Sequence, residues 1–156
     1  MTVEAMGAPE TAPSGYVLEH FFFQRQFAEL VDPTTIDKDA PASAFRMSWD
    51  WAWDSKDGFT VSLTLALLES QLRPERIELT LVARFHQEGE SGPLTIDNFA
   101  RYSAPAMMFP YLRQQVTSLT WAGPIGPLVL PPMNIIQMME GMDPNDTTAA
   151  KSPRPE

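Results

Sequence analysis

The chain has 156 residues, of which 44% are hydrophobic and 20% charged, a composition typical of one globular domain with a hydrophobic core. Lys and Arg number 11 against 20 Asp and Glu, and the formal net charge of -9 opposes binding to nucleic acid or to an anionic membrane surface. Because the chain has no cysteine, disulfide frameworks, thiolate metal sites and cysteine nucleophiles are excluded.

Both ends of the sequence are expected to be disordered tails, residues 1–15 and 143–156. Each is rich in Pro, Ala, Thr and polar residues and lacks the apolar content needed to offset the entropy of ordering. The first tail has no apolar core of the length found in signal peptides, and no later stretch is long enough to span a membrane. We therefore expect one cytoplasmic domain over residues 16–142.

The first predicted element of this domain is a strand, Tyr16–Leu30, which contains three consecutive phenylalanines at positions 21–23. Successive side chains of a strand point to opposite faces, so these phenylalanines must reach both faces of a sheet. The turn-rich segment Val31–Pro41 is longer than the commonest hairpin connections, and we expect it to cross over part of the structure.

Three further strands are indicated by alternation of apolar and polar residues. The clearest is Phe45–Asp54; the turn residues 56–58 then lead into a second, Val61–Leu67, which predicts a hairpin. The segment Ile77–Phe85 alternates in the same way. Together with the first strand, these segments predict a four-stranded antiparallel sheet.

Helical spacing replaces alternation in the last third of the domain. Asp97 or Asn98 could cap a short turn before Pro105 resets the backbone, and a long helix is predicted over Ala106–Trp121, with Gly123 after its end.

An extended proline-rich stretch, Pro124–Pro132, and a final helix, Ile135–Met142, capped by Asn134, are predicted next. The fold class is therefore α+β: a four-stranded antiparallel sheet backed by a long helix and a short C-terminal helix.

No group of residues in the sequence has the spacing of a catalytic or metal site. The two histidines, His20 and His86, fall on different predicted strands without a metal-ligand pattern or a nucleophile. Asp50 and Asp54 lie on the polar side of a strand, where solvation explains them. The loop Glu88–Gly92 is too short and acidic to hold a phosphate. We expect neither enzymatic activity nor a cofactor.

Large apolar residues are the unusual feature of the sequence. Trp49, Trp51 and Trp53 share one face of a strand, where burial in the core is the first interpretation and contact with a client or subunit is the second. For the methionines of the last helix, both interpretations stay open. The phenylalanines at 21–23 cannot all be buried by one face of a single sheet, which favours association of subunits.

A run of residues resembles the C-terminal half of the SecB protein-export chaperone family. It comprises Phe109-Pro110-Tyr111-Leu112-Arg113, then Thr117-Ser118, then Gly123, Leu128, Leu130, Pro132 and Asn134. The predicted order of elements over 16–142 is similar to that family as well. The resemblance implies a tetramer, a dimer of dimers, that holds unfolded or extended polypeptides in apolar grooves without ATP, for protein export and translocation.

The resemblance also suggests which side chains bind clients. In the family the client surface comes from the connector after the first strand, the second strand and the two C-terminal helices. The client-binding residues expected on this sequence are Phe27, Trp49, Trp51, Trp53, Tyr111, Met133, Ile136, Met139 and Met142.

The positions with which the family docks on the SecA motor are partly changed here. Arg25 stands where an aspartate is expected and Leu81 where another docking acid is expected, whereas Glu29 keeps its acid. Holding a dedicated partner such as an antitoxin is therefore a second possible role, in addition to protein export. A carrier of a lipophilic small ligand and an adaptor for one folded partner are the alternatives from other functional classes.

Overall fold

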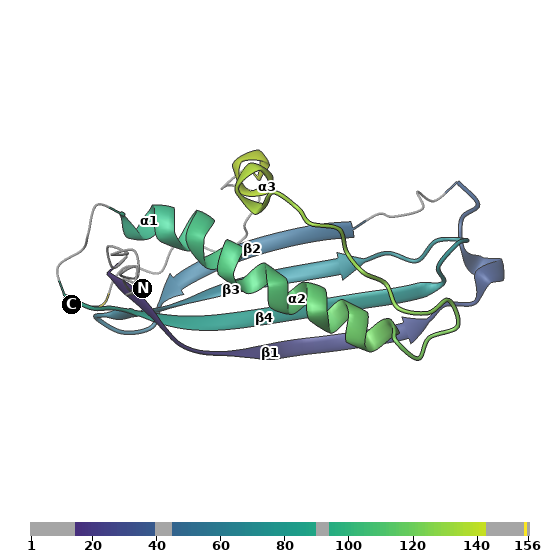
Figure 1. Ribbon diagram of the computed structural model, residues 1–156, viewed down its shortest axis with the longest axis horizontal. Helices are drawn as coiled ribbons and strands as arrows, with labels where there is room; N and C mark the ends of the chain where they lie inside the picture. The colour runs from purple at the N-terminus through teal and green to yellow at the C-terminus, as the bar shows by residue number, and fades with distance from the viewer. Residues whose placement is uncertain (1–14, 40–44, 90–93, 143–154, 156) are drawn as a thin grey trace, which may run out of the picture.

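The computed structural model describes residues 15–39, 45–89 and 94–142, together with Pro155. Four strands form one sheet, α2 lies diagonally across one of its faces, and α3 lies beside the β2 edge (Figure 1). The elements are β1 Tyr16–Leu30, β2 Phe45–Trp53, β3 Gly58–Leu67, β4 Glu75–Gln87, α1 Ile96–Asn98, α2 Ala104–Thr120 and α3 Ile135–Gly141. The predicted α+β class is confirmed. Apart from Gly15 and Pro155, the two predicted tails lie outside the described residues.

The strand order is β1-β4-β3-β2, and every neighbouring pair is antiparallel. Because β1 and β2 are at opposite edges, the segment between them has to cross the end of the sheet, as its length predicted. Within residues 31–39 it contains a short 3-10 turn, Pro33–Thr35. The side-chain amide of Gln71 donates to the carbonyls of Pro33 and Ile36 and so attaches this crossover to the β3–β4 turn.

The core lies between α2 and one face of β3 and β4. The alternating residues Phe59–Leu67 of β3 and Ile77–Phe85 of β4 that face α2 are all buried, and α2 adds Met108, Leu112 and Val116. The opposite face of the same strands is polar and half-buried, with the hydroxyls of Thr64 and Thr80 in contact at 2.9 Å.

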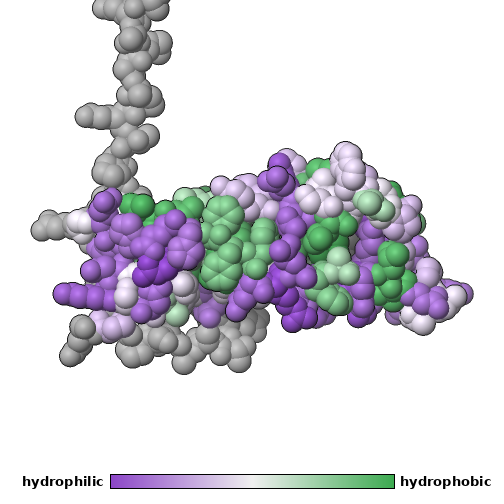
Figure 2. Space-filling model, turned by 90° about the horizontal axis from the view of Figure 1, so that it is seen from below, coloured by the Kyte–Doolittle hydropathy of each residue, from purple (hydrophilic) through white to green (hydrophobic). Residues whose placement is uncertain are grey.

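The three consecutive phenylalanines do reach both faces. Phe21 is paired with Ala83 and Phe23 with Leu81, which places both on the face that α2 covers, whereas Phe22 is paired with Val82 on the opposite face. Phe22 is 49% exposed. Figure 2, which views the molecule from the β1 side, shows apolar side chains gathered at the middle of this side and again toward one end, with hydrophilic side chains between them.

The helical region begins at Ile96, earlier than the expected caps Asp97 and Asn98 allow. Thr95, not Asp97 or Asn98, is the N-cap: its hydroxyl accepts from the backbone N–H of Asn98 at 3.3 Å. The N-cap residue stands just before the first helical residue, so Asp97 and Asn98 lie inside the first turn. The expected break at Pro105 was also wrong.

A π-helical turn, Phe99–Ser103, joins α1 to α2 without a break. In this turn an N–H bonds the carbonyl five residues back, as Ala104 does with Phe99. The next donor in that register would be Pro105, which has no N–H, so the carbonyl of buried Ala100 needs another partner. The indole Nε1 of Trp49 supplies it at 2.8 Å. A side chain from the edge strand β2 thereby fixes the helical region to the sheet.

Replacing Trp49 with Phe is expected to lower the free energy of unfolding by about 1–3 kcal/mol, because the buried carbonyl of Ala100 loses its donor. Urea denaturation followed by circular dichroism measures the change. The control is Trp121→Phe, since Trp121 is 72% exposed and its replacement should change stability by less than about 0.5 kcal/mol. Equal effects of the two substitutions would contradict the role assigned to Trp49.

Candidate binding surface

The segment that links α2 to α3 forms the outer wall of the candidate site. It leaves the end of α2 near β1 and returns across the sheet to α3 on the β2 side (Figure 1). Residues 126–134 contain neither helix nor strand, as the prolines of this segment predicted. Along it, Leu130 is buried and Leu128 is half-buried, whereas Val129 is 66% exposed. Leu128 and Leu130 therefore face the sheet.

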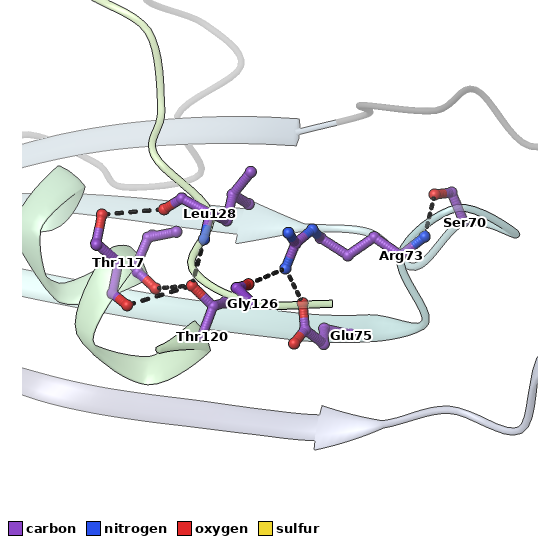
Figure 3. Close-up of polar contacts among 8 residues, drawn as sticks. Ser70, Arg73, Glu75, Thr117, Thr120, Gly126 and Leu128 are labelled. Carbon is purple, nitrogen blue, oxygen red and sulfur yellow. Dashed lines mark hydrogen bonds and ion pairs between the residues drawn. The ribbon is translucent and has the colours of Figure 1, made fainter. Parts of the chain in front are cut away.

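Side chains from α2 and from the β3–β4 turn attach this linker to the domain (Figure 3). The hydroxyl of Thr117 donates to the carbonyl of Leu128 at 3.0 Å, and the hydroxyl of Thr120 accepts from the Leu128 N–H at 2.7 Å. Arg73 donates to the carbonyl of Gly126 at 3.2 Å. Because both backbone groups of Leu128 are satisfied by side chains, the linker is held without joining the sheet.

The Arg73 guanidinium also forms an ion pair with Glu75, whose side chain is only 8% exposed. Glu75 lies close to the linker: a Cβ at Gly123 would collide with its carboxylate. A side chain at 123 would therefore displace the Glu75 carboxylate from its present position, and glycine allows the close approach of the linker to β4. A buried carboxylate is tolerated here because Arg73 neutralises it.

An apolar pocket lies between the linker and the ends of β2 and β3. Its volume is about 310 Å³. Most of the lining is apolar and comes from three separate parts of the chain: Phe45, Leu67, Leu68, Leu72, Ile77, Leu128, Leu130, Pro131 and Met133, with Ser70, Arg73 and Glu75 as the polar members. At its edge Leu68 is 39% and Leu72 is 71% exposed, so the apolar surface continues to solvent.

Most of this pocket was missed in the sequence, and only Met133 was among the predicted site residues. Two signals were available. Leu68 follows Leu67 and breaks the alternation of β3, and Leu72 is an isolated apolar residue in a polar turn. Neither signal identifies the other walls, because these are up to about sixty residues away in the chain.

The predicted tryptophan row lies on the helix-covered face of β2. Trp49, Trp51 and Trp53 are paired with the buried β3 residues Leu63, Val61 and Phe59, and all three are half-buried against the core. Edge-to-face ring contacts link Trp51 and Trp53 to each other and to Phe59, with centroids 5.6–6.0 Å apart. The row belongs mainly to the core and keeps a partly exposed side at the β2 edge.

The residues predicted on α3 differ in their exposure. Asn134 caps the helix as predicted: its side-chain oxygen accepts from the N–H of Gln137 at 3.1 Å. Met139 has no exposed surface, so it anchors α3 to the core and is not available for direct contact, whereas Ile136 is 53% exposed. Met133 and Met142 are half-buried.

Two predicted client residues lie away from this group. Tyr111 is on α2, 41% exposed, and its ring lies 4.3 Å from that of Phe21 on β1. Phe27 is paired with Glu78, which places it on the face of the sheet that no helix covers. The guanidinium of Arg25 lies 6.0 Å from the Phe27 ring centroid.

Ion pairs link the charged side chains of the uncovered face of the sheet. Glu29 is paired with Arg76 at 3.0 Å, and Arg76 also hydrogen-bonds Glu69, which lowers the pKa of Glu69 to about 2. Arg84 binds both Glu19 and Asp54 and lowers the pKa of each carboxyl.

Leu81 and Arg25, the positions that the resemblance compares with SecA-docking acids, lie on opposite faces of the sheet. Leu81 is fully buried on the α2 side, so its comparison with an exposed docking acid was wrong. The neighbouring positions on the uncovered face are Thr80 and Val82, and neither is acidic. Arg25 is paired with Glu78 at 3.1 Å.

Within residues 15–39, 45–89 and 94–142, no three His, Asp or Glu side chains come together to hold a metal ion. Across that part of the chain, none of the helices has the length and hydrophobicity that crossing a membrane would need. The features that remain for function are the apolar pocket, the half-buried tryptophans on the same face of the sheet, and the exposed side chains of α2 and α3.

Replacing Thr120 with Val tests the attachment of the linker. The change keeps the shape of the side chain but removes the acceptor for the Leu128 N–H, and we expect the free energy of unfolding to fall by about 1–3 kcal/mol. Ser118→Ala is the matched control, because the Ser118 hydroxyl is exposed and bonds only the carbonyl of Gln114 in its own helix. Chemical denaturation of both variants gives the comparison; a loss no larger than that of the control would argue against the tether.

No protein-family model matches the sequence, and no curated protein matches it significantly. The structure is similar to that of the Mycobacterium tuberculosis SecB-like chaperone Rv1957, solved in complex with a ChAD peptide from the HigA1 antitoxin Rv1956. The sequence identity is 18%, the TM-score is 0.57, and the match covers 76% of this chain and 88% of the other.

A second similar structure is that of a Streptococcus agalactiae protein of unknown function, with 12% identity, a TM-score of 0.48, and coverage of 78% of this chain and 100% of the other. The first match agrees with the four-stranded antiparallel sheet, the long helix and the short C-terminal helix described above. The chain therefore has the fold of the SecB-like chaperones.

Proposed function

We propose that this protein is an ATP-independent holding chaperone that binds unfolded or extended polypeptides through apolar surface and catalyses no reaction. The observation that carries the proposal is the apolar pocket under the α2–α3 linker, which opens to solvent beside Leu68 and Leu72. Contiguous apolar surface of this kind is uncommon on a protein that has no partner.

The size of the pocket supports a polypeptide client. At about 310 Å³ it is at the lower limit of pockets that enclose a drug-sized ligand. It has room for one or two large apolar side chains, and the rest of an extended segment would lie outside it, along the linker or the β2 edge. Affinity would then come from several modest apolar contacts, which gives low sequence specificity.

The similarity to the SecB-like chaperone bound to an antitoxin peptide supports the same class of client. Among the predicted client residues, Trp49, Trp51, Trp53, Met133, Ile136 and Met142 keep exposed surface on the same side of the sheet as the pocket, and we retain them. Tyr111 and Phe27 would extend the client path to α2 and to the far face. Met139 would take part only if α3 moved.

The charged side chains at the positions compared with the SecA-docking residues bear on the choice between export and a dedicated client. Glu29 is paired with Arg76, and Arg25 with Glu78, so the acidic character that SecA docking requires is reduced on this face. We therefore favour a dedicated polypeptide partner, such as an antitoxin, over delivery to SecA. The absence of cysteine and the excess of acidic residues are compatible with a cytoplasmic chaperone that prefers basic unfolded segments.

A carrier of a lipophilic small ligand is the second candidate, and the same pocket favours it. The two functions differ in the number of molecules bound per chain. They also differ in whether the bound molecule is an unfolded protein. A carrier would bind a fatty acid or similar ligand at one site per chain and would leave the aggregation of an unfolded protein unchanged.

The test of the chaperone function is suppression of aggregation. The purified protein is mixed with chemically denatured clients without nucleotide, and light scattering and size-exclusion chromatography record aggregation and complex formation. We expect delayed aggregation and a stable complex. Absence of both across a panel of clients would show that the proposed function is wrong.

The pocket is tested with the double variant Leu68→Asp, Leu72→Asp. Both side chains are partly or mostly exposed, so folding should be retained, and client affinity should fall about tenfold because two apolar contacts are lost. Ile125→Asp is the matched control, since Ile125 is 53% exposed and lines none of the described pockets. Fluorescence anisotropy with a labelled unfolded client measures both affinities; equal affinities would exclude the pocket from client binding.

Assembly as a tetramer, a dimer of dimers, is the second part of the proposal. β1 is an edge strand of 15 residues that carries exposed Phe21, Phe22 and Phe27, and an open edge of this length invites pairing with another chain. Light scattering coupled to size-exclusion chromatography is expected to give four times the mass of one chain. A stable monomer at micromolar concentration would contradict it.

A further inference from the structure

Methionine is concentrated in the last described part of the chain. Four of the ten residues 133–142 are methionine, at positions 133, 138, 139 and 142. The short helix α3 carries two of them, and the other two flank it. The chain has no cysteine, so methionine thioethers are its only sulfur groups.

The four side chains differ in access to solvent. Met139 is 0% exposed, whereas Met133, Met138 and Met142 are half-buried and pack against the edge of the core. A small oxidant therefore has access to three of the four side chains while α3 is in place. The fourth is protected until the helix leaves.

The attachment of α3 is limited. It has seven residues, and a helix of this length does not persist in water without packing. Its buried side chains are Ile135 and Met139, and Arg101 donates to the carbonyls of Met139 and Met142 at 3.2 and 3.1 Å. The half-buried methionines supply a large share of the remaining apolar contact.

We propose that oxidation of Met133, Met138 and Met142 by hydrogen peroxide releases α3 and thereby increases the apolar surface that holds clients. The regulatory part of this proposal rests on the proposed chaperone function. In each oxidation the thioether sulfur attacks one peroxide oxygen, an S–O bond forms and the O–O bond breaks. The sulfur is oxidised by two electrons to the sulfoxide, and the peroxide is reduced to water after proton transfer to the departing oxygen.

The direction of the effect follows from what is exposed. A sulfoxide is polar, so it weakens the packing of the side chain that carries it. Release of α3 uncovers Ile135, Met139 and the core surface beneath them, which are all apolar. The surface gained for clients is therefore larger than the partly exposed thioether surface lost. Weaker packing of these three methionine side chains should raise the population with α3 detached on the order of tenfold.

The experiment begins with the full-length protein treated with hydrogen peroxide. Peptide mass spectrometry identifies the sulfoxides, and hydrogen–deuterium exchange of residues 135–141 reports release of α3 without any client. We expect Met133, Met138 and Met142 to oxidise before Met139, and exchange in α3 to rise about tenfold. Client holding is then measured by light scattering and should increase in the oxidised protein. Methionine sulfoxide reductases should reverse both changes.

Two variants separate the role of these methionines from general oxidation damage. In Met133→Leu, Met138→Leu, Met142→Leu the side chains keep their volume but cannot form sulfoxides, so peroxide should change neither exchange nor holding. Met107→Leu is the control, because Met107 is 45% exposed on α2 and is not one of the methionines of residues 133–142, so this variant should respond like the unmodified protein.

The outcomes distinguish the two proposals. If the untreated protein holds no client, the chaperone function fails, but exchange still reports whether sulfoxides release α3. Unchanged exchange in the oxidised protein, a response that persists in the triple leucine variant, or a decrease in holding after oxidation would each overturn the proposed switch.

Discussion

The structure depends on a single geometric constraint: one helix must cover the apolar face of a four-stranded sheet. The 17 residues of α2 extend about 26 Å, whereas the 13 residues of β4 extend about 43 Å. Neighbouring strands are about 4.8 Å apart, so the outer strands are about 14 Å apart and a helix about 10 Å wide covers only part of them. The diagonal course of α2 leaves opposite corners of this face without a helix (Figure 1).

Segments outside α2 add to the cover of this face by irregular means. A hydrogen bond from Trp49 replaces the donor that Pro105 lacks and joins the helical region to β2. The linker after α2 covers the other end of β2 and β3, held by Thr117, Thr120 and Arg73. A linker covers less surface than a helix does, and the apolar pocket beside Leu72 is the space left between it and the sheet.

The two faces of the sheet therefore differ in what they can bind. The helix-covered face ends in an apolar pocket and a methionine-rich helix, which suit apolar segments of an unfolded chain. On the other face, Arg76 and Arg84 are each shared between two carboxylates, those of Glu29 and Glu69 and those of Glu19 and Asp54, so the acidic side chains are held in ion pairs. Phe22 and Phe27 remain exposed there, which favours a protein partner or a second subunit over an ionic ligand.

The sequence by itself determined the strands, the two main helices and the polar and apolar faces, because these depend on local periodicity and caps such as Asn134. Periodicity also predicted that Phe22 would be on the opposite face from its neighbours. It wrongly predicted a break at Pro105, since the partner of the Ala100 carbonyl comes from Trp49, 51 positions earlier in the chain.

The tertiary structure alone decided the strand order, the course of the linker, the burial of Met139, and the pocket lined by Phe45, Leu72 and Leu128. Each of these depends on contacts between segments far apart in the chain, and a pattern of neighbouring residues carries no information about which distant segment lies opposite.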